Sequence, residues 1–111
     1  MQNKHKDNTQ HYALIFAALG DKTRLSLVSN LANGNPCSIA QLTAGSALTR
    51  QAVTKHLQVL EEVGLVQSTR NGRENLFELN TQPFNDMQEF MDFISKQWDE
   101  AIGRLRGFVE K

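Results

Sequence analysis

The Asn71-Gly72 pair constrains the fold of this chain more than any other feature of its sequence. It separates two stretches, 65–70 and 73–79, in which polar and apolar residues alternate as they do in β-strands. An Asn-Gly pair between such stretches is typical of a two-residue type I′ turn. Residues 65–79 are therefore predicted to form a short antiparallel hairpin. The turn also predicts two cross-strand pairs, Val66 with Phe77 and Arg70 with Arg73.

The segment before the hairpin has the pattern of an amphipathic helix at residues 49–63. Thr49 is a suitable N-cap, and Gly64 stands where a left-handed residue often ends a helix. Apolar residues form one side, and the opposite side carries side chains that donate hydrogen bonds. The apolar set is Ala52, Val53, Leu57, Val59, Leu60 and Val63, and the polar set is Arg50, Gln51, Thr54, Lys55 and Gln58.

Three shorter helices are predicted before this segment, and one long helix after the hairpin. The first has Tyr12, Ile15, Phe16 and Leu19 on one side, the second follows Asp21 with Leu25, Val28 and Leu31, and the third follows Ser38 with Ile39 and Leu42. The last begins at Pro83 and continues towards Val109. The fold class is thus mainly α with a small β-hairpin (α+β), in the order α-α-α-α-β-β-α.

Length and composition bound the class of protein. The 111 residues suit one compact domain, and a content of 40% hydrophobic residues is enough for a core. No apolar run approaches the roughly 20 residues of a membrane span, and residues 1–10 are too polar for a secretory signal. We therefore expect a cytoplasmic protein that makes no membrane contact. Cys37 is the only cysteine, which excludes an intrachain disulfide and a four-cysteine zinc site.

The formal net charge is zero, which by itself argues against a nucleic-acid partner. The distribution of charge is more informative than the sum. Between Leu42 and Val59 the only formal charges are those of Arg50 and Lys55, and the hairpin adds two arginines. Acidic residues gather elsewhere, namely Glu61, Glu62, Asp86, Glu89, Asp92, Asp99 and Glu100. A local basic face is therefore compatible with a neutral protein.

A short helix, a tight turn at 44–47 and a longer amphipathic helix are the parts of a helix-turn-helix. The major groove of DNA is about 12 Å wide and admits one helix, whose N-terminal residues make most base contacts. Arg50 and Lys55 are suited to guanine, and Gln51 to adenine. A solvated surface helix has the same polar face, so the hairpin decides between the two interpretations. Two directly opposed arginines repel each other, and a phosphate backbone would offset that repulsion.

These patterns predict a winged helix-turn-helix protein that binds double-stranded DNA and is not an enzyme. We divide it into a flexible arm at 1–10, the DNA-binding unit at 11–80 and a dimerisation helix at 81–111 of the same domain. The alternative is a winged helix that binds only another protein. No nucleophile–base pair, phosphate-binding glycine loop or metal-ligand cluster indicates catalysis. The predicted DNA-binding residues are Thr49, Arg50, Gln51, Thr54, Lys55, Gln58, Arg70, Asn71 and Arg73.

Two segments carry a family resemblance: Ala18-Leu-Gly-Asp-Lys-Thr-Arg-Leu25 and Gln51-Ala-Val-Thr-Lys-His-Leu-Gln-Val-Leu-Glu-Glu-Val-Gly-Leu-Val66. They are similar to the ArsR family of prokaryotic winged-helix regulators, and the resemblance covers about residues 12–79. It implies a homodimeric repressor that binds a palindromic operator and releases it when an effector arrives. Two departures are visible: Lys22 replaces a frequent proline, and Ala47 replaces a frequent turn glycine, so a slightly different turn is expected.

Some members of the ArsR family sense metals, and their sites use cysteine or histidine ligands. One type of site resembles a Cys-Val-Cys-Asp-Leu run, and the matching stretch here, 38–42, contains no cysteine. Another type places histidine on the last helix, where this sequence has none. Because these soft ligands are missing, we expect no metal and no cofactor. Cys37 is interpreted as a small, partly buried apolar residue, and the effector stays unknown.

Two further features are interpreted from their position. His56 shares a helix side with apolar residues, which indicates a core or interface histidine with a satisfied ring nitrogen; a base contact is the alternative. The long last helix has an apolar side that is large for one small domain, so we expect it to pair with a second copy rather than fold back on its own core. The predicted interface consists of Tyr12, Phe16, Phe90, Met91, Ile94, Trp98 and Ile102.

Overall fold

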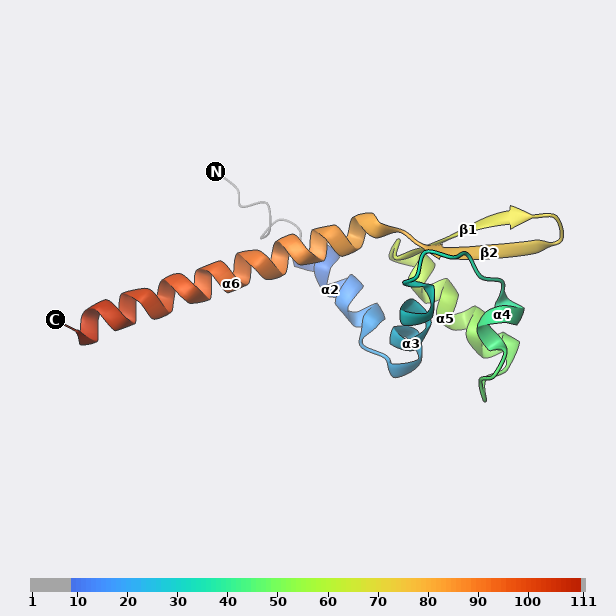
Figure 1. Ribbon diagram of the computed structural model, residues 1–111, viewed down its shortest axis with the longest axis horizontal. Coiled ribbons are helices and arrows are strands. Elements are labelled where there is room, and N and C mark those ends of the chain that lie inside the picture. The colour runs from blue at the N-terminus through green and yellow to red at the C-terminus, as the bar shows by residue number, and fades with distance from the viewer. Residues whose placement is uncertain (1–8, 111) are drawn as a thin grey trace.

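A computed structural model describes residues 9–110 of the chain. Its elements follow the order helix, helix, helix, helix, hairpin, helix, which confirms the predicted order and fold class (Figure 1). They are α2 (Thr9–Leu19), α3 (Lys22–Leu31), α4 (Ile39–Thr43), α5 (Arg50–Glu62), β1 (Val66–Asn71), β2 (Glu74–Leu79) and α6 (Thr81–Val109). The molecule is elongated, 68 × 32 × 21 Å, because α6 extends away from the other elements and the hairpin projects at the opposite end.

The core lies where α2, α3, α5 and the hairpin meet. Its fully buried side chains come from each of these elements, and Met87 adds the first turns of α6. The core side of α3 differs from the prediction, because Leu27 is buried and Leu25 is 54% exposed. The fully buried large side chains are Ile15, Leu31, Leu57, Leu60, Leu65, Val53 and Val66.

Three predicted helix starts are confirmed by their capping hydrogen bonds. The Asp21 carboxylate accepts from the Arg24 backbone N–H at 3.0 Å, and the Thr49 hydroxyl accepts from the Ala52 N–H at 3.1 Å. Ser38 forms a reciprocal capping box with Gln41 at the start of α4. At the end of α5, Gly64 adopts φ +81°, the left-handed conformation predicted there.

The hairpin is formed as predicted, but its register differs by two residues. Val66 lies opposite Leu79, and Arg70 lies opposite Asn75. Asn71 ends β1 and pairs with Glu74, so the two loop residues are Gly72 and Arg73. Gly72 has φ +65° and no non-glycine residue within 9–110 has a positive φ, a combination that fits a type II′ turn and excludes type I′. The predicted pairs Val66–Phe77 and Arg70–Arg73 are therefore wrong, and no two arginines face each other across the strands.

A third short extended segment, which the sequence pattern did not indicate, joins the hairpin to the loop before α4. Cys37 forms an isolated antiparallel bridge with Phe77. The Cys37 N–H donates to the Phe77 carbonyl at 2.9 Å, and the Phe77 N–H donates to the Cys37 carbonyl at 2.7 Å. This bridge fixes β2 next to Ser38, the residue that caps α4. The hairpin, called here the wing, is thereby connected to the start of α4 through backbone hydrogen bonds.

Both terminal helices differ in part from the prediction. The proposed arm at 1–10 lies outside the described residues except for Thr9 and Gln10, which form the first turn of α2. The last helix begins at Thr81 rather than Pro83, with Asn80 as its N-cap, because a proline is tolerated anywhere in the first helical turn. Its predicted end at Val109 is confirmed. Within residues 9–110, no helix is both long and apolar enough to cross a membrane.

Candidate DNA interface

The helix-turn-helix consists of α4, a turn and α5. The turn bends at Gly45, which has a φ of +75°. The glycine of the turn thus lies two residues before Ala47, the position at which the family resemblance implies a glycine. Thr49 then caps α5, and the helix begins at Arg50. The longer helix packs its other side on the core through Val53, Leu57 and Leu60.

The polar side of α5 presents the side chains that the sequence predicted. Arg50, Gln51, Lys55 and Gln58 are exposed, and together with Thr54 they line a shallow concavity of about 460 Å³. The Thr54 hydroxyl donates to the Arg50 carbonyl at 2.7 Å, so its proton is used within the helix. The other four side chains have polar atoms directed to solvent. These side chains, called here the polar row, are therefore available to contact a polar ligand.

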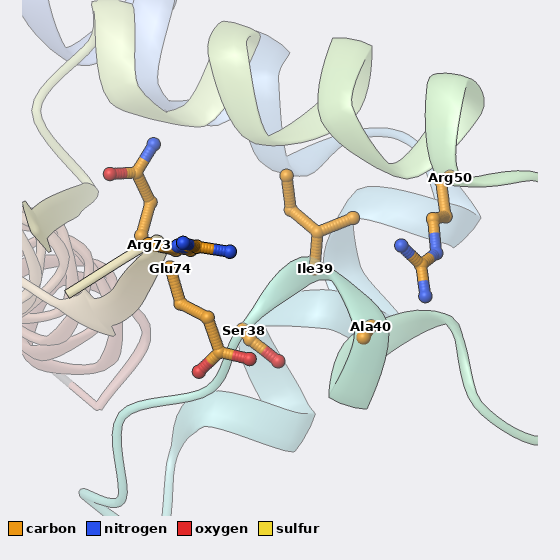
Figure 2. A pocket seen from close by; sticks show the side chains of 7 residues that line it. Ser38, Ile39, Ala40, Arg50, Arg73 and Glu74 are labelled. Carbon is orange, nitrogen blue, oxygen red and sulfur yellow. The ribbon is translucent and has the colours of Figure 1, made fainter. Parts of the chain in front are cut away.

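A second concavity, of about 250 Å³, lies between the start of α5, α4 and the base of the wing turn. The side chains of Arg50 and Arg73 both line it, and Figure 2 shows them on either side of Ile39. Glu74 also lines it, with its carboxylate near Ser38. Two guanidinium groups from different elements thus share one cleft, although the single carboxylate offsets part of their charge.

The two remaining predicted residues of the wing are both exposed, but only one has its side chain held by a hydrogen bond that the structure shows. Arg70 is exposed, and its Nε donates to the Gly72 carbonyl at 3.2 Å, which holds the side chain against the turn. Asn71 is exposed at the last position of β1. At the far end of α5, Glu61 accepts a hydrogen bond from the Ser68 hydroxyl at 2.9 Å. The acidic end of α5 is therefore directed towards β1, and the basic end lies beside α4 and the wing turn.

The sequence pattern did not indicate a role for Arg24, a residue of α3 that contacts His56 of α5. Its Nη1 lies 3.3 Å from Nδ1 of His56, whose side chain is 25% exposed. The expectation of a satisfied ring nitrogen is confirmed, and His56 is half-buried like Ala52 and Val59 on the same side of the helix. Asp21 is the second neighbour, and the N–H of Arg24 keeps the pKa of this carboxylate below its ordinary value of 3.8.

The apolar side of the last helix is exposed along most of its length. Tyr12 is buried within the chain against Phe90, and Phe90 is half-buried. Beyond them a continuous set of large apolar side chains faces solvent in the single chain, with Phe16 of α2 beside it. This set, called here the α6 stripe, consists of Met91, Ile94, Trp98, Ile102 and Leu105.

Within residues 9–110, no three histidine, cysteine, aspartate or glutamate side chains lie close enough together to hold a metal ion. Cys37 is half-buried, and its Sγ donates to the Asn35 carbonyl at 3.5 Å. Its position agrees with the interpretation of a small, partly buried residue.

Known proteins with similar sequences are transcriptional regulators. Residues 19–69 match a family described as a helix-turn-helix domain. The chain is 38% identical over 79 residues to an uncharacterised HTH-type transcriptional regulator, YuzN, of Bacillus subtilis, covering 66% of this chain and 86% of that protein. It is 36% identical over 91 residues to a protein of Synechocystis named as a transcriptional repressor SmtB homolog, covering 81% and 68% respectively.

Two solved structures with a similar fold are also described as regulators or DNA-binding domains. An ArsR-like transcriptional regulator from Rhodococcus is similar with a TM-score of 0.82 and 28% identity, covering 92% of this chain and 95% of that chain. A homodimeric winged helix-turn-helix DNA-binding domain from Mycobacterium bovis has a TM-score of 0.64 over 90% of this chain and 89% of that chain. Its identity is only 18%, so it supports the fold alone.

Proposed function

The chain belongs to the ArsR family of winged helix-turn-helix transcriptional regulators, and we propose that it acts as a homodimeric repressor that binds double-stranded operator DNA. The observation that carries this proposal is the exposed polar row of α5, which begins at Arg50 directly after the turn of the helix-turn-helix. A helix presented in this way enters the major groove with its N-terminal residues against the base edges.

We assign base contacts to Gln51 together with Arg50 or Lys55. Gln51 is suited to a bidentate contact with adenine, and the two basic side chains to guanine. Thr49, Thr54 and Gln58 are placed to support these contacts at the edge of the same row. Because the Thr54 hydroxyl proton is used within the helix, we assign Thr54 the role of an acceptor or of an apolar contact through its methyl group.

We assign backbone contacts to the wing. Two directly opposed arginines do not occur in the observed register, where Arg70 pairs with Asn75. The support comes instead from the cleft that Arg73 shares with Arg50, because a phosphate backbone that crosses this cleft would meet a guanidinium from the wing and one from α5. Arg70 and Asn71, exposed near the wing turn, would contact the neighbouring phosphates.

We propose that a second copy of the chain covers the α6 stripe. Its members are large, apolar and contiguous, and in water such a surface is strongly disfavoured unless a partner covers it. Pairing of two α6 helices, with Phe16 of α2 at the edge, would bring the two α5 helices into one complex. For a palindromic operator they should lie about 34 Å apart, which is one turn of DNA.

The test is DNA selection from a random-sequence library, followed by affinity measurements over a range of salt concentrations. If Arg70, Arg73 and whichever of Arg50 and Lys55 contacts no base each neutralise one phosphate in each protomer, log affinity should fall with log salt with a slope of about −5. The selected sequences should contain two related half-sites in opposite orientation. A chain that binds only another protein would select no sequence and show no salt-dependent binding, and this outcome would overturn the proposal.

A further inference from the structure

Arg24 lies at the meeting point of three helices. It belongs to the first turn of α3, its Nε donates to the Ala18 carbonyl near the end of α2, and its Nη1 lies 3.3 Å from Nδ1 of His56 in the middle of α5. Asp21, which caps α3 through the Arg24 N–H, has a carboxylate oxygen 3.9 Å from the same ring nitrogen. The Arg24 side chain therefore links α5 to α2 and α3.

The chemistry of this contact fixes the protonation state of the ring. A guanidinium can only donate hydrogen bonds, so Nδ1 of His56 must accept. If Nδ1 is protonated, Arg24 loses its acceptor and two positive charges face each other at the distance of a hydrogen bond.

We propose that the Arg24–His56 contact positions α5 for base recognition, and that protonation of His56 releases this contact and weakens specific DNA binding. The inference rests on the proposed function, because it concerns how the same helix is held. Arg24 and His56 are positioning residues, since neither side chain belongs to the polar row that would face DNA. Specific DNA binding is then expected to be weaker in acid than near neutral pH.

A directional contact to the middle of α5 matters here because, apart from the Ser68–Glu61 hydrogen bond at its far end, the helix is held mainly by apolar packing. Val53, Leu57 and Leu60 bury the helix against the core, and such contacts tolerate small rotations and shifts. Base recognition requires side chains held to within about 0.5 Å of the productive geometry. A hydrogen bond from a charged donor to the middle of the helix provides this constraint.

The charged groups around the ring favour loss of the Arg24 contact over its replacement by an equivalent contact with Asp21. Within residues 9–110, the charged side chains in hydrogen-bond or ion-pair distance of the His56 ring are Arg24 and Asp21, both from the beginning of α3. The Asp21 carboxylate would attract an imidazolium, but at 3.9 Å it lies beyond hydrogen-bond distance and it already accepts from the Arg24 N–H. A protonated ring would therefore lose the directional hydrogen bond from Arg24 and keep only the longer ion-pair contact with Asp21.

The experiment compares wild-type protein with His56→Asn, at about pH 7.5 and about pH 5.5, on the duplex that wild type selects from a random library. An asparagine keeps an acceptor close to the position of Nδ1 and cannot be protonated in this range. Wild-type affinity is expected to fall by about 10-fold more than that of His56→Asn on acidification, a factor that corresponds to about 1.4 kcal/mol. His11→Asn is the matched control and should keep the wild-type loss.

Two further measurements separate positioning from folding. Affinity for a random-sequence duplex at low salt should change equally in all three proteins, because phosphate contacts depend less on the orientation of α5. If His56→Asn does not fold, Arg24→Gln serves the same purpose, since without the guanidinium the extra loss in acid should disappear.

The outcomes distinguish the two proposals. If wild type shows no specific, salt-dependent binding at either pH, the proposed function is wrong. If wild type binds specifically and His56→Asn loses affinity in acid as wild type does, only the positioning role is overturned. Loss that is equal for specific and random duplexes would also overturn it.

Discussion

The ring of Tyr12 lies 4.9 Å from the ring of Phe90, centroid to centroid, with the planes inclined by 31°. This contact joins the first helix of the described chain to the last and lies between the core and the exposed α6 stripe. Beyond Phe90, the helix continues to Val109 with little contact to its own chain. The Tyr12–Phe90 pair therefore determines where the packed part of α6 ends.

Replacement of Tyr12 by alanine should destabilise the fold by about 3 kcal/mol, because the ring is 3% exposed and its loss leaves a cavity beside Phe90. Urea unfolding at a fixed protomer concentration measures the change. Leu14→Ala is the control on the same helix, since Leu14 is 55% exposed and should change stability by less than about 1 kcal/mol. Equal effects of the two substitutions would contradict the assignment of Tyr12 to the core.

Substitution of Trp98 by glutamate should break the proposed dimer. Trp98 is 66% exposed in the single chain, and a buried interface tryptophan typically contributes about 2 kcal/mol or more. The dimer dissociation constant should then rise by about 30-fold or more, as measured by sedimentation equilibrium. Lys96→Glu introduces the same side chain on the other side of α6 and should leave the dimer intact. A Trp98→Glu protein that stays dimeric would place the interface elsewhere.

Arg73→Ala and Gln51→Ala should affect DNA binding in different ways. Loss of a phosphate contact at Arg73 weakens binding to all sequences and reduces the salt slope by about 1 for each arginine removed. Loss of a base contact at Gln51 costs about 1–3 kcal/mol on the preferred site and relaxes the choice of one base pair in each half-site, with the salt slope unchanged. Affinities for single-base variants of the site, at several salt concentrations, distinguish the two patterns. The reverse assignment of effects would contradict the proposed roles.

Gly64→Ala and Gly103→Ala should change stability in opposite directions. A Cβ atom meets nothing within 4 Å at either position, so the backbone conformation decides. Gly64 has φ +81°, where an alanine costs about 1 kcal/mol, whereas Gly103 lies inside α6, where alanine is favoured by about 1 kcal/mol. Thermal unfolding followed by circular dichroism measures both effects. Destabilisation by Gly103→Ala would instead indicate a partner in close contact with that side of α6.

The cap at Asp21 predicts a loss of stability in acid. The pKa of its carboxylate is lowered mainly by the N–H of Arg24, so the folded state favours the ionised form more than the unfolded state does. Its stabilising effect is present above the pKa of the unfolded state and is lost as the pH falls through the lower pKa of the folded state. Asp21→Asn keeps a capping acceptor but cannot ionise, so its stability should depend less on pH below about pH 4. Urea unfolding of the two proteins at acidic and neutral pH provides the comparison, and parallel curves would contradict this role.

The elements that could be predicted from sequence are those fixed by nearby residues. Asp21, Ser38 and Thr49 each cap a helix through a residue three positions later, so their patterns are visible in the sequence. The polar row of α5 follows from helical period alone. The family was likewise identified from α3 and α5, where the motif residues are contiguous.

What could not be predicted depends on contacts between distant segments. The predicted register of the wing was wrong by two residues, because the loop residues are Gly72 and Arg73 rather than Asn71 and Gly72, and a glycine at the first loop position suits a type II′ turn. A shift of two residues preserves which side chains face the core, so hydrophobic alternation could not reveal it. Arg24 was missed for the same reason, since its partner His56 is 32 residues away.

The bridge between Cys37 and Phe77 has a consequence for the thermodynamics of DNA binding. Because it ties β2 to the residue before the α4 cap, the wing and α5 keep a fixed relative position before any DNA is present. A flexible wing would lose conformational entropy on docking, and that loss would subtract from the affinity. Here the cost is met when the protein folds, so the contacts of the wing are available in full to the complex.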